Sequence, residues 1–420
     1  MKALIVSFWS NLDFVSTKYK IFDEKGEKTS VEYEALNESL AEAEYLKEAK
    51  IDTKISVFLP SLLSYAISDP PPDYEQLTQQ ISNEAKNKIP ADYVHVLPSE
   101  GEIKNHVHKG GIGNFHFLFY LKLYEDLLKE QPDLVILDLS RTYSYFQAYA
   151  KSATQLAIED YVSTTGGKEV FLIEFVNINN ELTPIFTKDF KKIKIQEYLT
   201  ANVRLSKEKG FSTQGRSDLY AIGKSVELGF PLLLVYLLRE SDKLIRPEEF
   251  EKTIISSIKV NKSNEKYEVV ASFDAHENAP YYFMGYHFVN QYKSVVGGEG
   301  EVTIDTLQKI SELFEEPQRN LVDREIDLLR DFSKIPKEKG EYLLDYLIKL
   351  GNTRLIDWMK GEIPEEEREE CEINEDEMYS HAGLGRKLTK IKIDEKGITV
   401  EYAESCIDKI ISWIKNLGKG

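Results

Sequence analysis

The sequence predicts an α/β domain followed by a mostly helical domain. Short apolar runs rich in β-forming residues alternate with helical patterns through the first 180 residues, and helical patterns dominate the rest of the chain. A chain of 420 residues is also long enough for two domains. We therefore expect one domain over 1–190 and another over 191–420, with the boundary near 190–210.

The predicted strands of the first half are apolar along most of their length, which is typical of parallel strands covered by helices on both faces. They lie at 3–9, 54–60, 93–98, 133–140 and 169–178. Helical patterns fill the intervals, at 32–50, 74–89, 115–130 and 144–161. This alternation predicts a Rossmann-like, doubly wound parallel sheet.

The second half begins after a last strand or a linker at 184–195. Helical patterns then cover 197–209, 216–240, 304–317, 320–334, 340–360 and 403–417. The stretch 253–293 interrupts them, because "TIISSIKV", "YEVVASFD" and "YYFMGYHFV" have the composition of strands. We expect a small β insertion there.

The charge of the chain restricts its partners. A formal net charge of −18 argues against electrostatic binding to double-stranded DNA, which requires a basic face. A small nucleotide or a transiently bound RNA remains compatible with this charge. The longest apolar run, 228–238, has 11 residues and an internal proline, so we expect no membrane span.

The first ten residues have the pattern of a strand rather than of a signal peptide, so we expect a cytoplasmic protein. Cys371 and Cys406 have neither C-x-x-C spacing nor histidine neighbours, so no metal site is expected. Reduced thiols are the favoured state of these cysteines in the cytoplasm, and a disulfide between them is the alternative.

Polar residues follow the predicted strands at the edge where open parallel sheets bind ligands. Three segments contribute candidate ligand-binding residues: Ser7, Trp9, Ser10 and Asn11; Lys109, Gly110, Gly111 and Asn114; Asp138, Ser140, Arg141, Thr142 and Tyr143. Hydroxyl groups, free N–H groups at a helix start and an arginine suit a phosphate. Helix capping is the alternative role for the serines and threonines. Neither G-x-G-x-x-G after the first strand nor a P-loop occurs, so a nucleotide is favoured over a magnesium-bound triphosphate.

The segment "NEDEMYSHAGLGRK" (374–387) contains the candidate catalytic residues Tyr379, His381 and Arg386. RNA cleavage without a metal needs a base, an acid and a cation that stabilises the charged phosphorane. Histidine suits the proton transfers and arginine suits the phosphorane. The alternative role for His381 is that of a helix C-terminal cation before a glycine cap.

Both halves resemble one known family. "ALIVSFWSNLDFVSTKYKI" (3–21) and "DLVILDLSRTYSYFQAYA" (133–150) resemble a CARF domain, the cyclic-oligoadenylate sensor of type III CRISPR systems. Asp138 and Leu139 match its D-[LIV]-T-H-G motif, whereas residues 140–142 depart from it. "MYSHAGLGRKLTKIKIDEKGITVEYAESCIDKI" (378–410) resembles the closing stretch of a HEPN domain, including a short hairpin before the last helix.

This resemblance implies a homodimer or a higher homo-oligomer that acts in antiviral defence. Cyclic oligoadenylate, we expect cyclic tetra-adenylate, would bind across paired CARF domains as the allosteric activator. Paired HEPN domains would then cleave single-stranded RNA without a metal or other cofactor. The family motif is an arginine, then four to six residues, then the histidine, but residues 374–377 carry three acids and no arginine. The alternative is therefore a nuclease-inactive receptor, a sponge or a ring nuclease.

Overall fold

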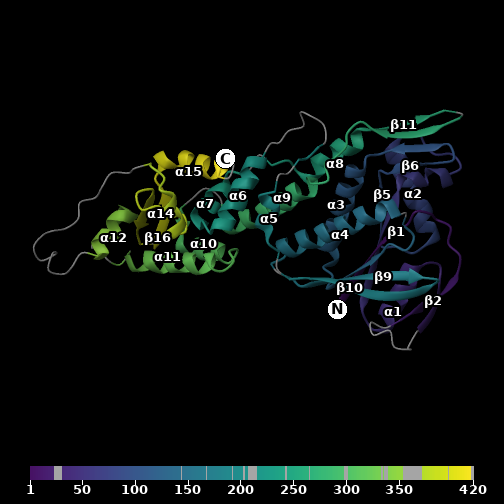
Figure 1. Ribbon diagram of the computed structural model, residues 1–420, viewed down its shortest axis with the longest axis horizontal. Coiled ribbons are helices and arrows are strands. Elements are labelled where there is room, and N and C mark those ends of the chain that lie inside the picture. The colour runs from purple at the N-terminus through teal and green to yellow at the C-terminus, as the bar shows by residue number, and fades with distance from the viewer. Residues whose placement is uncertain are drawn as a thin grey trace, which may run out of the picture. The chain divides into compact units, whose positions relative to one another are not determined.

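The computed structural model divides the chain into two compact units (Figure 1). The first comprises Met1–Ile193, Val203–Thr213 and Arg246–Phe283, and the second comprises Lys194–Asn202, Gln214–Ile245 and Met284–Gly420. The chain thus returns twice to the first unit after residue 193, which a single boundary does not describe. The structure describes all residues except 23–30, 143, 167, 192, 202–203, 207–214, 242–243, 264, 298–300, 333, 335–338, 353–370, 396 and 418–420.

The first unit is built on an eight-stranded sheet with the order β3-β2-β10-β9-β8-β1-β4-β5. The neighbours β9, β8, β1, β4 and β5 are parallel, which confirms the predicted Rossmann-like arrangement. All five correspond to strands that the sequence predicts. The strands are β1 (Lys2–Phe8), β2 (Thr17–Ile21), β3 (Val31–Ala35), β4 (Asp52–Pro60), β5 (Tyr93–Leu97), β8 (Leu134–Asp138), β9 (Val170–Ile178) and β10 (Glu181–Phe190).

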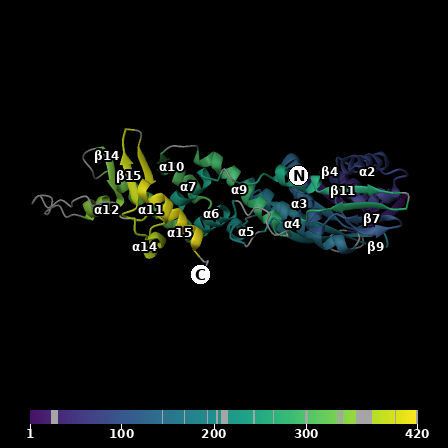
Figure 2. The ribbon, with the colours of Figure 1, turned by 90° about the horizontal axis from the view of Figure 1, so that it is seen from above.

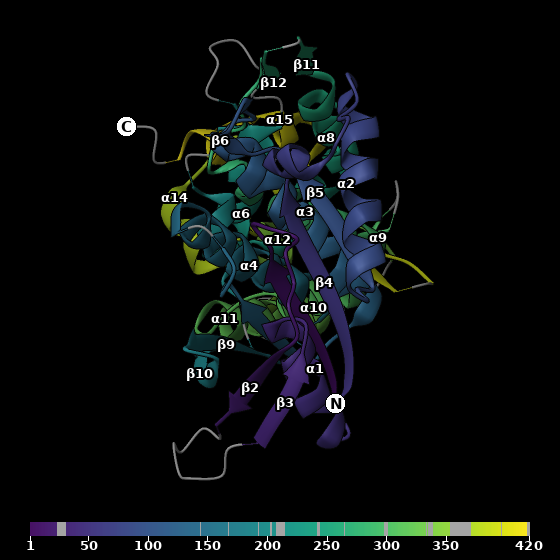
Figure 3. The ribbon, with the colours of Figure 1, turned by 90° about the vertical axis from the view of Figure 1, so that its right-hand side faces the viewer.

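Helices cover both faces of this sheet, as the apolar strands require. Side chains of β1 alternate between the two faces. Ala3 and Ile5 join the core formed with α1 (Glu38–Glu48) and α2 (Tyr74–Lys88). Phe8 lies against Phe115 of α3 (Ile112–Glu130) and Phe146 of α4 (Ser144–Thr164) on the other face. Figure 3 shows α2 and α3 flanking β5.

The hairpin of β2 and β3 extends the sheet and was not expected from the sequence. Residues 32–35 belong to β3, so the prediction of a helix beginning at residue 32 is wrong at its start. Glu32 and Glu34 alternate with less polar residues in this strand, and glutamate is a weak strand former. The helix begins later, where the side chain of Asn37 accepts a hydrogen bond from Leu40 N as its N-cap.

A second sheet contains the predicted β insertion. Its order is β11-β12-β7-β6, with β6 (Glu100–Ile103), β7 (His106–Lys109), β11 (Ile258–Lys262) and β12 (Tyr267–Ala271). The insertion therefore adds strands to the first unit, and Figure 2 shows the green hairpin alongside β7. The short helices η1 (Ser61–Ala66) and α8 (Pro247–Ser256) also belong to this unit.

The prediction of strands up to residue 293 is wrong, because residues 279–296 form the helix α9 (Ala279–Val296). The run "YYFMGYHFV" consists mostly of apolar and aromatic residues, so it shows no alternation of polar and apolar positions. A short run of this kind fits a buried strand and a buried helix equally well, so periodicity does not separate them.

The second unit packs helices around a small sheet. Gly229, in a left-handed conformation, and Pro231 divide the helix expected at 216–240 into α6 and α7. The helices are α5 (Ile195–Leu199), α6 (Arg216–Leu228), α7 (Pro231–Arg239), α10 (Ile304–Ser311), α11 (Gln318–Phe332), α12 (Leu344–Asn352), α14 (Glu375–Ser380), η2 (Glu404–Cys406) and α15 (Ile407–Asn416). The sheet has the order β13-β16-β15-β14, with β13 (Val302–Thr303), β14 (Gly340–Leu343), β15 (Thr389–Ile393) and β16 (Ile398–Tyr402). The antiparallel pair β15–β16 is the hairpin that the resemblance implies.

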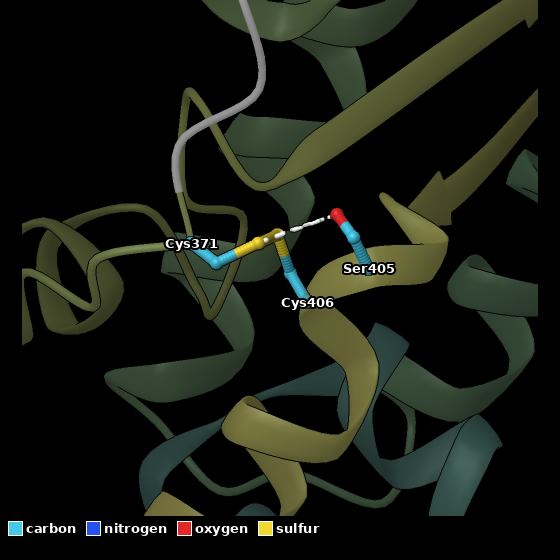
Figure 4. Close-up of a disulfide and its surroundings, with 3 residues drawn as sticks. All are labelled: Cys371, Ser405 and Cys406. Atoms are coloured by element: carbon cyan, nitrogen blue, oxygen red, sulfur yellow. Dashed lines mark hydrogen bonds between the residues drawn. A yellow bond between two sulfur atoms is a disulfide. The ribbon is translucent and has the colours of Figure 1, made fainter.

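A disulfide joins Cys371 to Cys406, which is buried at the start of α15 (Figure 4). The two Cα atoms lie 5.1 Å apart although 35 residues separate them in the sequence. The favoured expectation of two reduced thiols is therefore wrong. The bond anchors the segment that leads into α14 and His381.

Within the described part of the chain, no helix is both long enough and apolar enough to cross a membrane.

Two histidines of β7, a strand of the second sheet, form a buried polar cluster with serines of η1. Ser64 Oγ lies 2.8 Å from His106 Nδ1 and 3.0 Å from His108 Nε2, and Ser61 Oγ lies 2.9 Å from His108 Nδ1. Burial, and then the neighbouring His106, lowers the pKa of His108 to about 3. Burial and Lys104 lower the pKa of His106 as well. Both histidines are therefore neutral in the folded protein near neutral pH.

We predict that reduction of the Cys371–Cys406 bond destabilises the second unit by about 3–4 kcal/mol, because the bond restricts the unfolded chain. Urea unfolding with and without dithiothreitol, resolved by hydrogen exchange and mass spectrometry, measures this loss. Cys371→Ser should unfold like the reduced protein and should not respond to dithiothreitol. An equal response of the variant and the wild-type protein would contradict the prediction.

We also predict that acid destabilises the first unit through His106 and His108. Their folded-state pKa values are lowered, so the unfolded chain takes up protons first as the pH falls below about 6.5. Stability should then fall by up to about 1.4 kcal/mol for each pH unit and each histidine. Urea unfolding between pH 7 and pH 5 should show a shallower pH slope for His108→Gln than for wild type or a His287→Gln control. Equal slopes for all three proteins would refute this account.

Candidate functional site

Asp138, at the carboxyl end of β8, is the centre of a buried hydrogen-bond network. Its Oδ2 accepts hydrogen bonds from Ser7 Oγ at 3.1 Å and from Ser39 Oγ at 2.7 Å. Trp9 Nε1 donates to Ser7 Oγ at 2.8 Å. All four side chains are buried, so in this structure they join β1, β8 and α1 to one another. Direct contact of Ser7, Trp9 and Asp138 with a ligand stays a prediction.

Ser140 and Arg141 lie at the accessible side of this network. Ser140 is exposed, and both its N–H and its hydroxyl group donate to Asp138 Oδ1. Arg141 Nε donates to Glu38 Oε2 at 2.7 Å, and Nη1 donates to the carbonyl oxygen of Asp13 at 3.2 Å. The guanidinium group therefore already holds a carboxylate at the predicted anion site, which a phosphate would have to displace.

Main-chain contacts hold the other predicted residues of these two loops. Ser10 N donates to the carbonyl oxygen of Arg141 at 3.1 Å, and Thr142 Oγ1 donates to that of Phe8 at 3.1 Å. The Oδ1 atom of Asn11 is buried and has no hydrogen-bond partner among the described residues. An unpaired buried acceptor is costly, so this atom is an unsatisfied group of the loop after β1. Tyr143 lies outside the described residues.

The glycine-rich loop before α3 contacts another part of the same unit. Asn114 is fully buried, and its Nδ2 donates to the carbonyl oxygens of Gly110 at 2.8 Å and Phe273 at 2.6 Å. Its Oδ1 accepts from Ala275 N at 2.9 Å. These bonds satisfy the amide group of Asn114, which therefore attaches segment 273–275 to α3.

The N-terminus of α3 is occupied by a carboxylate of the protein itself. Asp274 Oδ1 accepts from Gly113 N at 3.1 Å and from Asn114 N at 3.3 Å. A Cβ atom at Gly113 would lie 1.7 Å from the carbonyl oxygen of Ala275, and one at Gly111 would lie 2.5 Å from Asp274 Oδ1. The glycines thus permit this internal contact. Lys109 is exposed at the end of β7, and no hydrogen bond between described residues joins its side chain to the Asp138 network.

Sequence reasoning missed the contribution of α1 to the Asp138 network. Glu38, Ser39 and Glu42 all lie in its first turns and are buried. Neither carboxylate oxygen of Glu42 has a partner among the described residues. Burial, followed by the charges of Asp138 and Glu38, raises the pKa of Glu42 well above its usual range. The four-residue spacing of the two glutamates on one helical face is the signal that could have indicated them.

In the second unit, His381 is the C-cap residue of α14 and precedes a left-handed turn. Ala382 and Gly383 both have positive φ angles, and a Cβ atom at Gly383 would lie 2.9 Å from the ring of Phe230. The turn brings Arg386 back toward His381. Arg386 Nη2 lies 3.3 Å from His381 Nε2. The structure thus brings together two of the three predicted catalytic residues.

The other ring nitrogen of His381 faces a buried carboxylate that sequence reasoning did not identify. His381 Nδ1 lies 3.3 Å from Oε2 of Glu325 on α11. Arg324 Nη2 donates to Glu325 Oε1 at 2.8 Å and to the carbonyl oxygen of Ser380 at 3.1 Å. Because 56 residues separate Glu325 from His381, no local pattern indicates this pair.

Arg386 is held by its main chain as well as by its side chain. Its N–H group donates to the carboxylate of Glu377, and its carbonyl oxygen accepts from Asp345 N at 3.0 Å. Its Nε atom is buried without a hydrogen-bond partner among the described residues. This buried guanidinium donor is therefore unsatisfied in the structure.

Tyr379 lies apart from the contact between His381 and Arg386. Its ring lies beside Phe230 and Trp413, with centroid distances of 5.9 and 6.3 Å. The structure gives its hydroxyl group no hydrogen bond to a described residue, and its predicted role in catalysis stays a prediction. Of the acidic stretch before α14, residues 362–370 lie outside the described residues.

Among the described residues, no three His, Cys, Asp or Glu side chains form a cluster that could hold a metal ion. The groups that could bind a ligand are the donors around Ser140 and Arg141 in the first unit and Arg386 beside His381 in the second.

Two family models match the chain. The CARF domain of the CRISPR system endoribonuclease Csx1 matches residues 4–181, and the HEPN domain of the same endoribonuclease matches residues 315–404. The first range contains the Asp138 network, and the second contains Glu325, His381 and Arg386. No curated protein matches the chain.

The two matched ranges follow one another in the order that the sequence resemblance implies, and together they span more than half of the chain. The chain therefore belongs to the CRISPR accessory proteins that combine a ligand-sensing CARF domain with an RNase-type HEPN domain.

Proposed function

We propose that this protein binds cyclic oligoadenylate, in particular cyclic tetra-adenylate, and responds by cleaving single-stranded RNA as a homodimer in the cytoplasm. The observation that carries the proposal is the contact of 3.3 Å between His381 Nε2 and Arg386 Nη2. It places a cation beside the histidine although the four positions 374–377 contain no arginine. Arg386 thus supplies the charge that the usual upstream arginine would supply.

The cleavage we propose needs no metal or other cofactor. His381 Nε2 takes the proton from a ribose 2′-hydroxyl group while the 2′-oxygen bonds to phosphorus. The bond between phosphorus and the 5′-oxygen breaks, and the histidine of the other protomer, which must first have taken up a proton on Nε2, donates that proton to the 5′-oxygen. The guanidinium group of Arg386 stabilises the charged phosphorane. The products are a 2′,3′-cyclic phosphate and a 5′-hydroxyl end.

Ligand sensing would take place where β1 and β8 end. Arg141 is the cation of this edge, and a phosphate of the ring would replace the Glu38 carboxylate at its guanidinium group. Ser140 and the backbone N–H groups of its loop would supply further donors. Because Glu38 belongs to α1, its release would change the position of that helix and supply a signal of ligand binding.

A second candidate function is that of a cyclic-oligoadenylate receptor without nuclease activity, which acts as a sponge or as a ring nuclease. The first turn of α14 favours this function, because Glu375 and Asp376 lie where the family motif carries its arginine. Carboxylates at these positions repel an RNA phosphate. Ser10 and Ser140 would then position the ring in the CARF domain.

We predict that Arg386→Ala lowers RNA cleavage by about 10²–10³-fold, as expected when one donor to a charged transition state is lost. Purified protein is mixed with cyclic tetra-adenylate and labelled single-stranded RNA, and the initial rate is measured. His381→Ala should abolish cleavage, whereas Arg330→Ala, on the exposed side of α11, should cleave like wild type.

Cleavage by Arg386→Ala at the wild-type rate would remove Arg386 from the mechanism. Binding of the ring by wild-type protein with no RNA cleavage would support the receptor function. If the wild-type protein neither binds the ring nor cleaves RNA, both functions are refuted.

We predict opposite effects of two substitutions on ligand affinity. Arg141→Ala should weaken the binding of cyclic tetra-adenylate by roughly 10–100-fold, because a charge-assisted hydrogen bond is lost. Glu38→Gln should tighten binding, because it removes the carboxylate that competes for Arg141 and keeps an acceptor for Asn177. Isothermal titration calorimetry measures both effects, with Glu32→Gln on the exposed strand β3 as the matched control. Weaker binding by Glu38→Gln would show that phosphate does not replace this carboxylate.

A further inference from the structure

We propose that Glu325 is the positioning residue of His381, and that it fixes the proton on Nδ1 so that Nε2 is available as a base. This inference rests on the proposed RNA cleavage, because the tautomer of His381 affects catalysis only if His381 acts as the base in that reaction. The geometry itself is independent of any RNA: Glu325 Oε2 lies 3.3 Å from Nδ1, and Arg386 Nη2 lies 3.3 Å from Nε2.

The two partners of the ring specify the same tautomer. A carboxylate only accepts hydrogen bonds, so the nitrogen that faces Glu325 must carry a proton. A guanidinium group only donates, so the nitrogen that faces Arg386 must present its lone pair. Together they select a neutral imidazole with Nδ1–H and an unprotonated Nε2. In a neutral histidine, the hydrogen bond of one ring nitrogen determines the state of the other.

Glu325 is held firmly enough to act in this way. Its side chain is only 7% exposed, and it belongs to the 15-residue helix α11. Arg324 Nη2 and Nε both donate to Oε1, at 2.8 and 3.2 Å, which leaves Oε2 for His381. Arg324 also donates to the carbonyl oxygen of Ser380, the residue before His381. The same arginine thus holds both the carboxylate and the end of α14.

Arg386 occupies the Nε2 lone pair in this structure, so it has to leave before that lone pair can take a proton. Its buried Nε has no hydrogen-bond partner among the described residues, and an RNA phosphate would offer the guanidinium group stronger acceptors than imidazole does. Once Arg386 moves to the phosphate, only Glu325 still determines the tautomer. The carboxylate then also offsets the charge of the imidazolium that forms.

The test observes His381 directly in the full-length protein. Protein with ¹⁵N-labelled histidine is studied by NMR in the absence of RNA, and His381→Gln identifies the signals of that residue among the seven histidines. Wild-type protein and Arg386→Ala should both show the Nδ1–H form. Glu325→Gln and Glu325→Ala should show a mixture of both tautomers, and the control Asp327→Asn, on the same helix, should match wild type.

An Nε2–H form in the wild-type protein would overturn the proposal. So would an unchanged Nδ1–H form in both Glu325 variants whose amide spectra remain those of a folded protein. Glu325→Gln keeps the size of the side chain but can present either its amide oxygen or its NH2 group to Nδ1, so it tests the need for an acceptor-only group even if Glu325→Ala unfolds.

RNA cleavage is the second measurement. Glu325→Gln should lower kcat by about 10–100-fold with KM unchanged, because a positioning residue acts on the base and not on RNA binding. Unchanged kcat with an altered tautomer would overturn the catalytic part of the proposal. If wild-type protein shows the Nδ1–H form that depends on Glu325 but cleaves no RNA, the proposed function fails and the positioning of His381 by Glu325 stands.

Discussion

The buried carboxylate of Asp138 is the constraint on which the arrangement of the first unit depends. An ionised carboxylate without hydrogen bonds inside a protein is very unfavourable, so its oxygens must be satisfied by nearby donors. Ser7, Ser39 and Ser140 supply these donors from β1, α1 and the loop after β8. The three segments are thereby fixed at the edge of the sheet where an open parallel sheet binds its ligands.

In each unit, an arginine that could contact phosphate already binds another group of the protein. Arg141 is bound by Glu38, and Arg386 lies against His381. A carboxylate belongs to each network as well: Ser140, next to Arg141 in the chain, donates to Asp138, and Glu325 contacts the histidine that Arg386 also contacts. A phosphate group therefore gains only the difference between its own interaction and the one it replaces. This difference gives each site a resting state as well as a bound state.

The sequence predicted those parts of the fold that depend on local patterns. The five parallel strands follow from apolar runs, and the helices α2 to α4 follow from the helical patterns between them. Arg386 could be proposed as a candidate because it stands only five residues after His381. Contacts between distant segments could not be predicted in this way: Ala275 binds Asn114 across 161 residues, and His381 contacts Glu325 across 56. In the sequence, the segments around Ala275 and Glu325 look like an ordinary loop and an ordinary helix, so nothing marks these two residues as partners.

The acids before His381 have structural roles that explain how they can replace the motif arginine. Glu375 accepts a hydrogen bond from Trp413 Nε1 at 3.0 Å, and the Glu377 carboxylate accepts from Arg386 N. Acidic residues also stabilise the first turn of a helix, and α14 has only six residues with which to present His381. The carboxylate that lies before the histidine in the sequence thus holds the arginine that follows it. Here the cation, Arg386, reaches the imidazole of His381 from the turn after α14. The acidic residues of α14 therefore serve to stabilise the helix and to hold Arg386.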